Sequence, residues 1–204
     1  MHHNFTCNVN GRKVMARAFT YGEYQQFFTG DTKQSVLRVI EECTGIDAGN
    51  LAVGDAETLF IQLWAHSLNR NSITRTWVCE CGEEQDLNLP LTKSRAESEF
   101  SFFHDLGGVV LHMREPRFND SSNPIEMVLT CIDYLIIDGE QFKLDDLSEK
   151  DFETVLSMIT QEHVQAIIDK LTENHVTLAV PVKCKCGACG VHVVKGLKEF
   201  LEVL

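Results

Sequence analysis

Alternating apolar and polar positions at the start of the chain predict a β-hairpin. Residues 5–9 and 12–18 both alternate, and Asn10-Gly11 lies between them. Asn-Gly between two alternating runs is typical of a two-residue turn. This register places the apolar side chains on one face: Phe5, Cys7, Val14 and Ala16.

Apolar positions spaced three and four residues apart predict helices after the hairpin. Thr20 and Asp31 each stand three residues before a Glu or Gln, so we expect capped helices there, the first running to Phe28. Gly45 is placed to end the second helix. Asp55 is placed to cap a third helix, whose wide apolar stripe predicts a core position: Leu59, Phe60, Leu63, Trp64 and Leu68.

Two strand–turn–strand patterns lie about a hundred residues apart, and each carries Cys-x-Cys-Gly at its turn. Residues 73–78 lead into Cys79-Glu80-Cys81-Gly82, and alternating leucines follow. Residues 176–182 lead into Cys184-Lys185-Cys186-Gly187, and residues 191–194 form a short strand. The chain then ends in an amphipathic helix, whose stripe is Leu197, Phe200, Leu201 and Leu204.

The segment between the two patterns is predicted to be mostly helical. Residues 109–113 form a strand, and Asn123-Pro124 begins a helix whose apolar stripe continues to Leu135 or Ile136. Asp138-Gly139 turns the chain. Two more helical patterns lie at 152–159 and 162–171.

The predicted fold is α+β. It combines an N-terminal β-hairpin and helices over residues 1–72 with a zinc-ribbon-like β unit and closing helix over 73–91 plus 176–204. Two distant Cys-bearing hairpins form that ribbon, and residues 92–175 form the mostly helical insertion. We expect these parts to form one compact unit.

Composition excludes several classes of protein. The 204 residues are 44% hydrophobic and 24% charged, which is globular usage. Eighteen Lys and Arg against 30 Asp and Glu give a net charge of −12, which repels phosphate backbones and disfavours nucleic-acid binding. No apolar run reaches the length of a membrane span, and residues 1–4 show no signal-peptide core, so we expect a cytoplasmic protein.

Five of the eight cysteines predict a metal site. Cys7, Cys43 and Cys131 stand singly among apolar neighbours and are expected in the core. Two tight turns that each supply thiolates are typical of a tetrahedral Cys₄ zinc site with a structural role. Its predicted ligands are Cys79, Cys81 and Cys186, completed by either Cys184 or Cys189, with His192 as a spare candidate. An iron–sulfur cluster uses the same ligands and remains an alternative.

Catalytic motifs are missing from the sequence. It has no Gly-x-Ser-x-Gly, no Gly-rich phosphate loop and no His-Glu-x-x-His. A catalytic site built from residues dispersed along the chain carries no such motif. A zinc-ribbon adaptor that binds nucleic acid or the transcription machinery is a second hypothesis. Its binding tip should be basic, whereas the first tip here carries Glu80, Glu83, Glu84 and Asp86.

The order of these elements resembles one family. A helix with Phe60, Leu63 and Ser67, a strand, the knuckle Cys79–Gly82 and the alternating residues 86–89 resemble the baseplate hub assembly proteins of T-even-like tailed bacteriophages. The C-terminal order also fits: a β run, a cysteine knuckle, a short strand, then Gly196-Leu197 and Phe200 on a closing helix.

This resemblance implies a role for the protein that the residue patterns alone do not. It implies a non-enzymatic protein that helps to build the central hub of a contractile tail. Its partners would be other tail and baseplate hub proteins, and not nucleic acid, a membrane or a small-molecule substrate. Its location would be the virion tail baseplate, assembled in the host cytoplasm.

Overall fold

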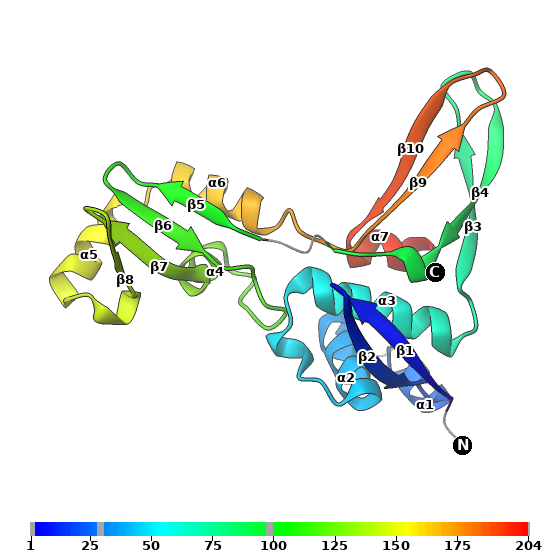
Figure 1. The fold of residues 1–204 in the computed structure, drawn as a ribbon, viewed down its shortest axis with the longest axis horizontal. Coiled ribbons are helices and arrows are strands. Elements are labelled where there is room, and N and C mark those ends of the chain that lie inside the picture. The colour runs from blue at the N-terminus through cyan, green and yellow to red at the C-terminus, as the bar shows by residue number, and fades with distance from the viewer. Residues whose placement is uncertain (1–2, 28–30, 97–99, 204) are drawn as a thin grey trace. The chain divides into compact units, whose positions relative to one another are not determined.

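The computed structural model describes residues 3–27, 31–96 and 100–203. It contains both helices and strands, as the predicted α+β class requires (Figure 1). Contacts group the chain into two compact units, Met1–Glu97 with His175–Leu204, and Ser98–Asn174. The division expected from the sequence (1–72, 73–91 with 176–204, and 92–175) stays a prediction; its first two parts share one unit here.

The N-terminal hairpin has the predicted register. Strands β1 (Asn4–Val9) and β2 (Arg12–Arg17) pair Val9 with Arg12, and Cys7 with Val14. Asn10 and Gly11 both have positive φ, 47° and 76°, as a type I′ turn requires. Cys7 is fully buried, so the predicted apolar face is the one that packs inward.

Helices α1 (Tyr21–Phe27), α2 (Thr32–Thr44) and α3 (Val53–Ser67) follow, with the short 3₁₀ turn η1 (Ala48–Asn50) before α3. The capping predictions for α1 and α2 are confirmed, whereas the one for α3 is wrong, because α3 begins at Val53 after Ala52 and Asp55 lies inside its first turn. Thr20 and Glu23 exchange side-chain-to-backbone hydrogen bonds, and Asp31 accepts from the Gln34 amide at 2.9 Å. Gly45 ends α2 with φ 72°. Phe28, the predicted end of the first helix, lies outside the described residues.

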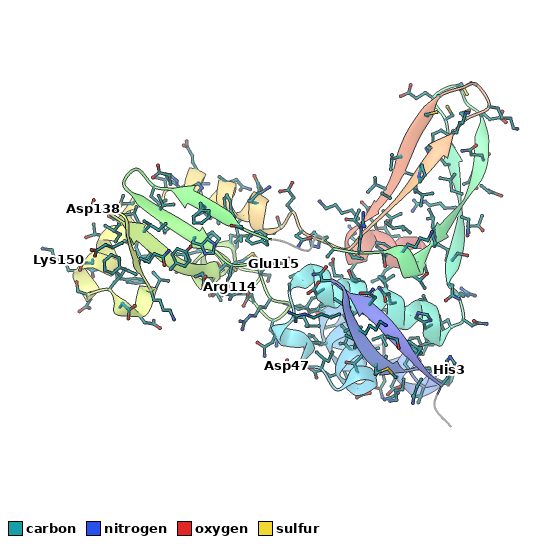
Figure 2. All side chains as sticks on the ribbon, viewed as in Figure 1. His3, Asp47, Arg114, Glu115, Asp138 and Lys150 are labelled. Carbon is teal, nitrogen blue, oxygen red and sulfur yellow. The ribbon has the colours of Figure 1, made fainter. Side chains whose placement is uncertain are left out.

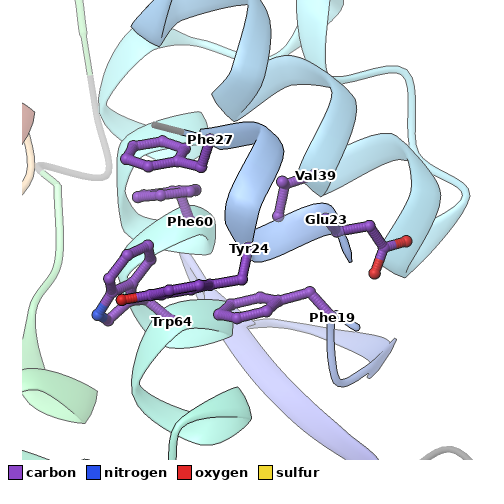
Figure 3. Close-up of a pocket in the computed structure, with 7 residues that line it drawn as sticks. All are labelled: Phe19, Glu23, Tyr24, Phe27, Val39, Phe60 and Trp64. Atoms are coloured by element: carbon purple, nitrogen blue, oxygen red, sulfur yellow. The ribbon is translucent and has the colours of Figure 1, made fainter. Parts of the chain in front are cut away.

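Aromatic side chains pack between α1 and α3. A shallow depression there is lined by Phe19, Glu23, Tyr24, Phe27, Val39, Phe60 and Trp64 (Figure 3). Ring centroids are 5.3 Å apart for Phe27 and Phe60, and 5.5 Å apart for Phe27 and Trp64. The lining side chains pack against one another, so this depression is part of the core of the unit.

Two antiparallel hairpins complete this unit. Strands β3 (Ser72–Val78) and β4 (Glu84–Pro90) form one, followed by the 3₁₀ turn η2 (Leu91–Lys93). Strands β9 (Thr177–Lys183) and β10 (Cys189–Lys195) form the other. Strand β4 lies beside β9, and the closing helix α7 (Gly196–Val203) contacts α3 and β10. Phe200 is fully buried there, while Leu204 lies outside the described residues.

The Ser98–Asn174 unit contains more β structure than we predicted. Its antiparallel sheet has the strand order β5 (Phe102–Asp105), β6 (Val109–Met113), β7 (Ile132–Ile137) and β8 (Glu140–Phe142). Three helices accompany it, α4 (Pro124–Cys131), α5 (Glu149–Met158) and α6 (Gln161–Leu171), with the 3₁₀ turn η3 (Leu144–Asp146) before α5. The segment predicted as a mostly helical insertion therefore also contains a four-stranded sheet, of which the prediction included only the strand at 109–113.

The main correction concerns residues 132–137. We predicted that the helix starting at Asn123-Pro124 would continue to Leu135 or Ile136, but it ends at Cys131 and the chain enters β7. Four of these six residues are β-branched or aromatic, which favours a strand. Asp138 and Gly139 have φ of 51° and 85° and form the tight turn of the β7–β8 hairpin (Figure 2).

Helix length and polarity also bear on a membrane span. Among the described residues, no helix is both long and apolar enough to cross a bilayer.

Candidate metal centre

The two Cys-x-Cys-Gly turns have the same backbone geometry. In the first, the Cys79 amide donates to the Glu83 carbonyl at 2.9 Å, and the Gly82 amide donates to the Cys79 carbonyl at 2.8 Å. In the second, the Cys184 amide donates to the Ala188 carbonyl at 2.8 Å, and the Gly187 amide donates to the Cys184 carbonyl at 3.0 Å. Both glycines have positive φ, 86° and 94°, which explains why glycine occupies that position.

These turns bring four sulfur atoms together. The Sγ atoms of Cys79, Cys81, Cys184 and Cys186 all lie within 4.8 Å of one another. Cys79 Sγ is 3.8 Å from Cys186 Sγ, and Cys81 Sγ is 3.6 Å from Cys184 Sγ, so each close pair joins the two hairpins. Cys79 and Cys184 are buried, whereas Cys81 and Cys186 are exposed.

The spacing of the sulfurs fits one metal ion. Four thiolates around a tetrahedral zinc ion, with Zn–S bonds of about 2.3 Å, lie about 3.8 Å apart. The two printed pairs, at 3.6 and 3.8 Å, are close to that value. All four positions would be filled by protein, which is typical of a structural site and leaves none for a substrate.

The other predicted ligands lie outside this group. Cys189 is exposed in β10, and its Sγ is 3.8 Å from the Gly187 carbonyl. His192 is further along the same strand, paired with Val180 of β9. Of the two candidates for the last ligand position, the structure thus brings Cys184 into the sulfur group and leaves Cys189 out. Cys7, Cys43 and Cys131 are buried, as predicted.

Backbone amides, burial and hydrogen bonds between the thiols shift the pKa values of Cys184 and Cys186 in opposite directions. The Ala188 amide, and then the thiols of Cys184 and Cys81, lower the pKa of Cys186 to about 7. For Cys184 the Cys186 amide lowers the pKa, but burial and hydrogen bonds with the other thiols raise it to about 12. A divalent cation bound among these sulfurs would favour deprotonation of the thiols.

An ion pair near the turns also connects the two hairpins. Lys185, inside the second turn, lies with Nζ 2.5 Å from a carboxylate oxygen of Glu83, which follows the first turn. The Lys185 side chain is 84% exposed, so this pair contributes little to stability. The ion pair links the same two turns as the sulfurs do.

A buried carboxylate anchors the other end of the second hairpin. Glu57 of α3 accepts hydrogen bonds from the Val176 amide at 2.9 Å, the Leu197 amide at 3.3 Å and His175 Nδ1 at 3.1 Å. These donors lie just before β9 and in the first turn of α7, more than a hundred positions from Glu57. The sequence pattern carries no local signal for this contact, and our sequence analysis missed it.

Comparison with known proteins shows which family the chain belongs to. The family model described as T4 bacteriophage base plate protein matches residues 1–202. The chain belongs to this family. It is also 35% identical over 207 residues, covering 99% of both chains, to the protein named "Baseplate hub assembly protein gp26" of Enterobacteria phage T4. No solved structure matches the chain.

Membership in the base plate family confirms the resemblance seen in the sequence. The relative's name describes assembly of the baseplate hub, which is the role that the resemblance implied. The match also runs through both cysteine turns, because it covers nearly the whole chain.

Proposed function

We propose that this protein is a non-enzymatic assembly or structural component of a contractile-tail baseplate hub and acts by contacts with other baseplate proteins. The observation that carries the proposal is the 35% identity to the T4 hub assembly protein over 99% of both chains. A similarity that spans the whole chain at this level makes a shared place in assembly the simplest inference. The protein would be built in the host cytoplasm and act at the tail baseplate.

A structural zinc ion at Cys79, Cys81, Cys184 and Cys186 is the second part of the proposal. Zinc would hold two hairpins whose cysteines are 103 and 107 positions apart in the closest pairs. Joining such distant segments carries an entropy cost that a metal ion offsets. Lewis-acid chemistry is not part of this role, since four protein ligands would complete the coordination.

The sulfur spacing favours a single ion over an iron–sulfur cluster. A cluster distributes its four cysteines over two or four irons, so sulfurs bound to different irons lie further apart than ligands of one ion. Here every pair of the four sulfurs is within 4.8 Å. The adaptor hypothesis receives no comparable support, because the first turn is flanked by acidic residues and the chain has a net charge of −12.

Affinity purification from infected cells tests the assembly role. Tagged full-length protein, collected at several times after infection, should co-purify with baseplate or tail proteins identified by mass spectrometry. Untagged protein from a parallel infection is the control for non-specific recovery. If no tail component is enriched at any time, the assembly role fails.

Metal analysis tests the zinc site separately. Protein purified without oxygen should contain about one zinc per chain and no visible absorption, since zinc is a d¹⁰ ion. Iron with a visible absorption band would contradict the zinc assignment. Absence of any metal, together with free thiols at Cys79, Cys81, Cys184 and Cys186, would contradict the site itself.

A further inference from the structure

Nearly all of the net charge of the protein belongs to one of its two units. Residues 98–174 contain 5 Lys and Arg against 16 Asp and Glu, a formal net charge of −11. The remaining residues contain 13 against 14, a net charge of −1. The acidic character noted in the sequence is therefore a property of the Ser98–Asn174 unit.

One face of the sheet in this unit is covered by its helices. The core cluster takes Leu111 from β6 and Leu135 from β7, and it includes Val128, Val155 and Ile167 from α4, α5 and α6. Phe102 of β5 packs against the same cluster. All three helices thus contribute to the core on this face.

The opposite face carries a row of aromatic rings. Phe103 of β5 pairs with His112 of β6, which pairs with Tyr134 of β7. The Phe103 and His112 ring centroids are 4.6 Å apart, and those of His112 and Tyr134 are 4.3 Å apart and stacked. Phe103 is 50% exposed. These three residues, with the neighbouring paired residues Val110 and Ile136, form what we call the aromatic face.

An acidic residue is positioned beside the row by an irregularity in strand pairing. His112 pairs with Tyr134 and Met113 with Ile132, so Asp133 has no direct partner and forms a β-bulge. Its carboxylate oxygen lies 3.3 Å from His112 Nδ1, and its side chain is 52% exposed. The bulge therefore presents a carboxylate next to stacked rings, which suits an arginine or lysine side chain.

We propose that the aromatic face is the docking surface for a baseplate protein that presents apolar side chains surrounded by Lys and Arg. Charge complementarity identifies this occupant. A unit with a net charge of −11 attracts a basic surface. The exposed Phe103 ring, beside the half-buried rings of His112 and Tyr134, supplies the apolar contact that anchors interfaces. Two copies meeting through this unit would each bring −11, and nucleic acid would be repelled in the same way. The inference rests on the proposed assembly role.

Site-specific photo-crosslinking in the full-length tagged protein tests the surface. A p-benzoylphenylalanine at position 103 samples the aromatic face, and the same label at position 153 samples the exposed side of α5. After infection and irradiation, position 103 should crosslink to a baseplate protein through a surface richer in Lys and Arg than in Asp and Glu. Position 153 should not.

A charge change provides the matched comparison. Asp133→Lys in the chain labelled at 103 should lower the crosslink yield about five-fold or more, since it places a cation where the partner's cation sits. Glu153→Lys makes the same charge change on an exposed residue away from the face and should lower it less than about two-fold. Thermal melts of both variants confirm that they fold.

The outcomes separate this proposal from the assembly role. Crosslinks from position 103 to a second copy, to the same chain, to nucleic acid or to an acidic surface would overturn it. Equal effects of the two charge changes would also overturn it. If position 103 yields no crosslink while the protein still co-purifies with baseplate proteins, the aromatic face is refuted and the assembly role stands. If no baseplate protein co-purifies, both fail.

Discussion

Cys79 Sγ lies 3.8 Å from Cys186 Sγ, although 107 positions separate the two residues in the chain. Each belongs to a different hairpin, and the two turns repeat the same pattern of backbone hydrogen bonds. A metal ion at this point would therefore act on the association of the hairpins and not only on the local turns. Metal content and stability of this unit should change together.

Substitution of single cysteines should separate ligands from bystanders. Cys184→Ser removes one of the four grouped sulfurs, so bound zinc should fall from about one to below about half per chain, because an incomplete ligand set loses much of its affinity. Cys189→Ser is the matched control. Cys189 lies three positions after Cys186 but outside the sulfur group, so this variant should retain zinc. Elemental analysis after gel filtration measures both. Zinc loss in the Cys189 variant alone would reverse the ligand assignment.

Removal of the metal should destabilise one unit only. All four sulfurs belong to the unit formed by Met1–Glu97 with His175–Leu204. Since a ligand that binds only the folded state stabilises it, a strong chelator should lower the melting temperature of this unit by about 5 °C or more. Differential scanning calorimetry should show the transition of the Ser98–Asn174 unit unchanged. Cys184→Ser protein should not respond to chelator, and an equal response would contradict the site.

The contact of Glu57 with the start of β9 and α7 should be a large contributor to stability. Glu57→Ala leaves the buried Val176 amide without its acceptor, and the free energy of unfolding should fall by about 3 kcal/mol. Glu57→Gln keeps an acceptor oxygen and should cost less. Urea denaturation measures the loss, and hydrogen exchange should accelerate at the amides of Val176 and Leu197.

Exchange at an amide in the other unit, such as that of Leu129, is the internal control for the Glu57 variants. It should not change, because Leu129 belongs to the Ser98–Asn174 unit. Unchanged exchange at Val176 in Glu57→Ala protein would show that the carboxylate does not hold this segment.

Local signals predicted more of the fold than long-range ones. The Asn10-Gly11 turn and the Asp31 cap depend on residues within a few positions, and both were confirmed. The helix predicted to run through Ile132 was wrong, because its three- and four-residue apolar spacing also fits a helix followed by a strand. The paired strand β6 supplies the context that favours a strand there, and that context is not local.

In the candidate site too, local patterns were predictive and long-range contacts were not. The spacing of Cys79, Cys81 and Cys186 identified three members of the sulfur group, since Cys-x-Cys-Gly is itself a local motif. The choice between Cys184 and Cys189 needed the structure, because both lie within a few residues of Cys186. Cys184 occupies the position equivalent to Cys79 in the repeated turn, whereas Cys189 already belongs to β10. Glu57 could not be predicted, since its partners are 118 to 140 positions away.

Acid should weaken the N-terminal region through Glu23. Arg17 forms two hydrogen bonds to this carboxylate, at 2.5 and 3.0 Å, and this contact, together with the Thr20 amide, lowers the pKa of Glu23 from 4.5 to about 2. A carboxyl group whose pKa is lower in the folded state contributes stability above its unfolded pKa and loses that contribution as the pH falls through its folded pKa. The contribution should therefore be complete above pH 4.5 and disappear between there and about pH 2.

Glu23→Gln is the variant that tests this dependence. At pH 7 it should unfold with a free energy about 2 kcal/mol lower than that of the unmodified protein, since the lost contact includes a two-point ion pair that is only partly exposed to water. The difference should shrink steadily in urea titrations at pH 4, 3 and 2.5. Below pH 4.5 the carboxyl group of the unfolded chain takes up a proton, whereas the folded one keeps its charge until about pH 2, so the two proteins converge. Glu41→Gln removes an exposed carboxylate from α2 and should change stability by less than about 0.5 kcal/mol at each pH. A gap between Glu23→Gln and the unmodified protein that stays constant from pH 7 to pH 2.5 would mean that the Arg17 contact does not act through the charge of Glu23.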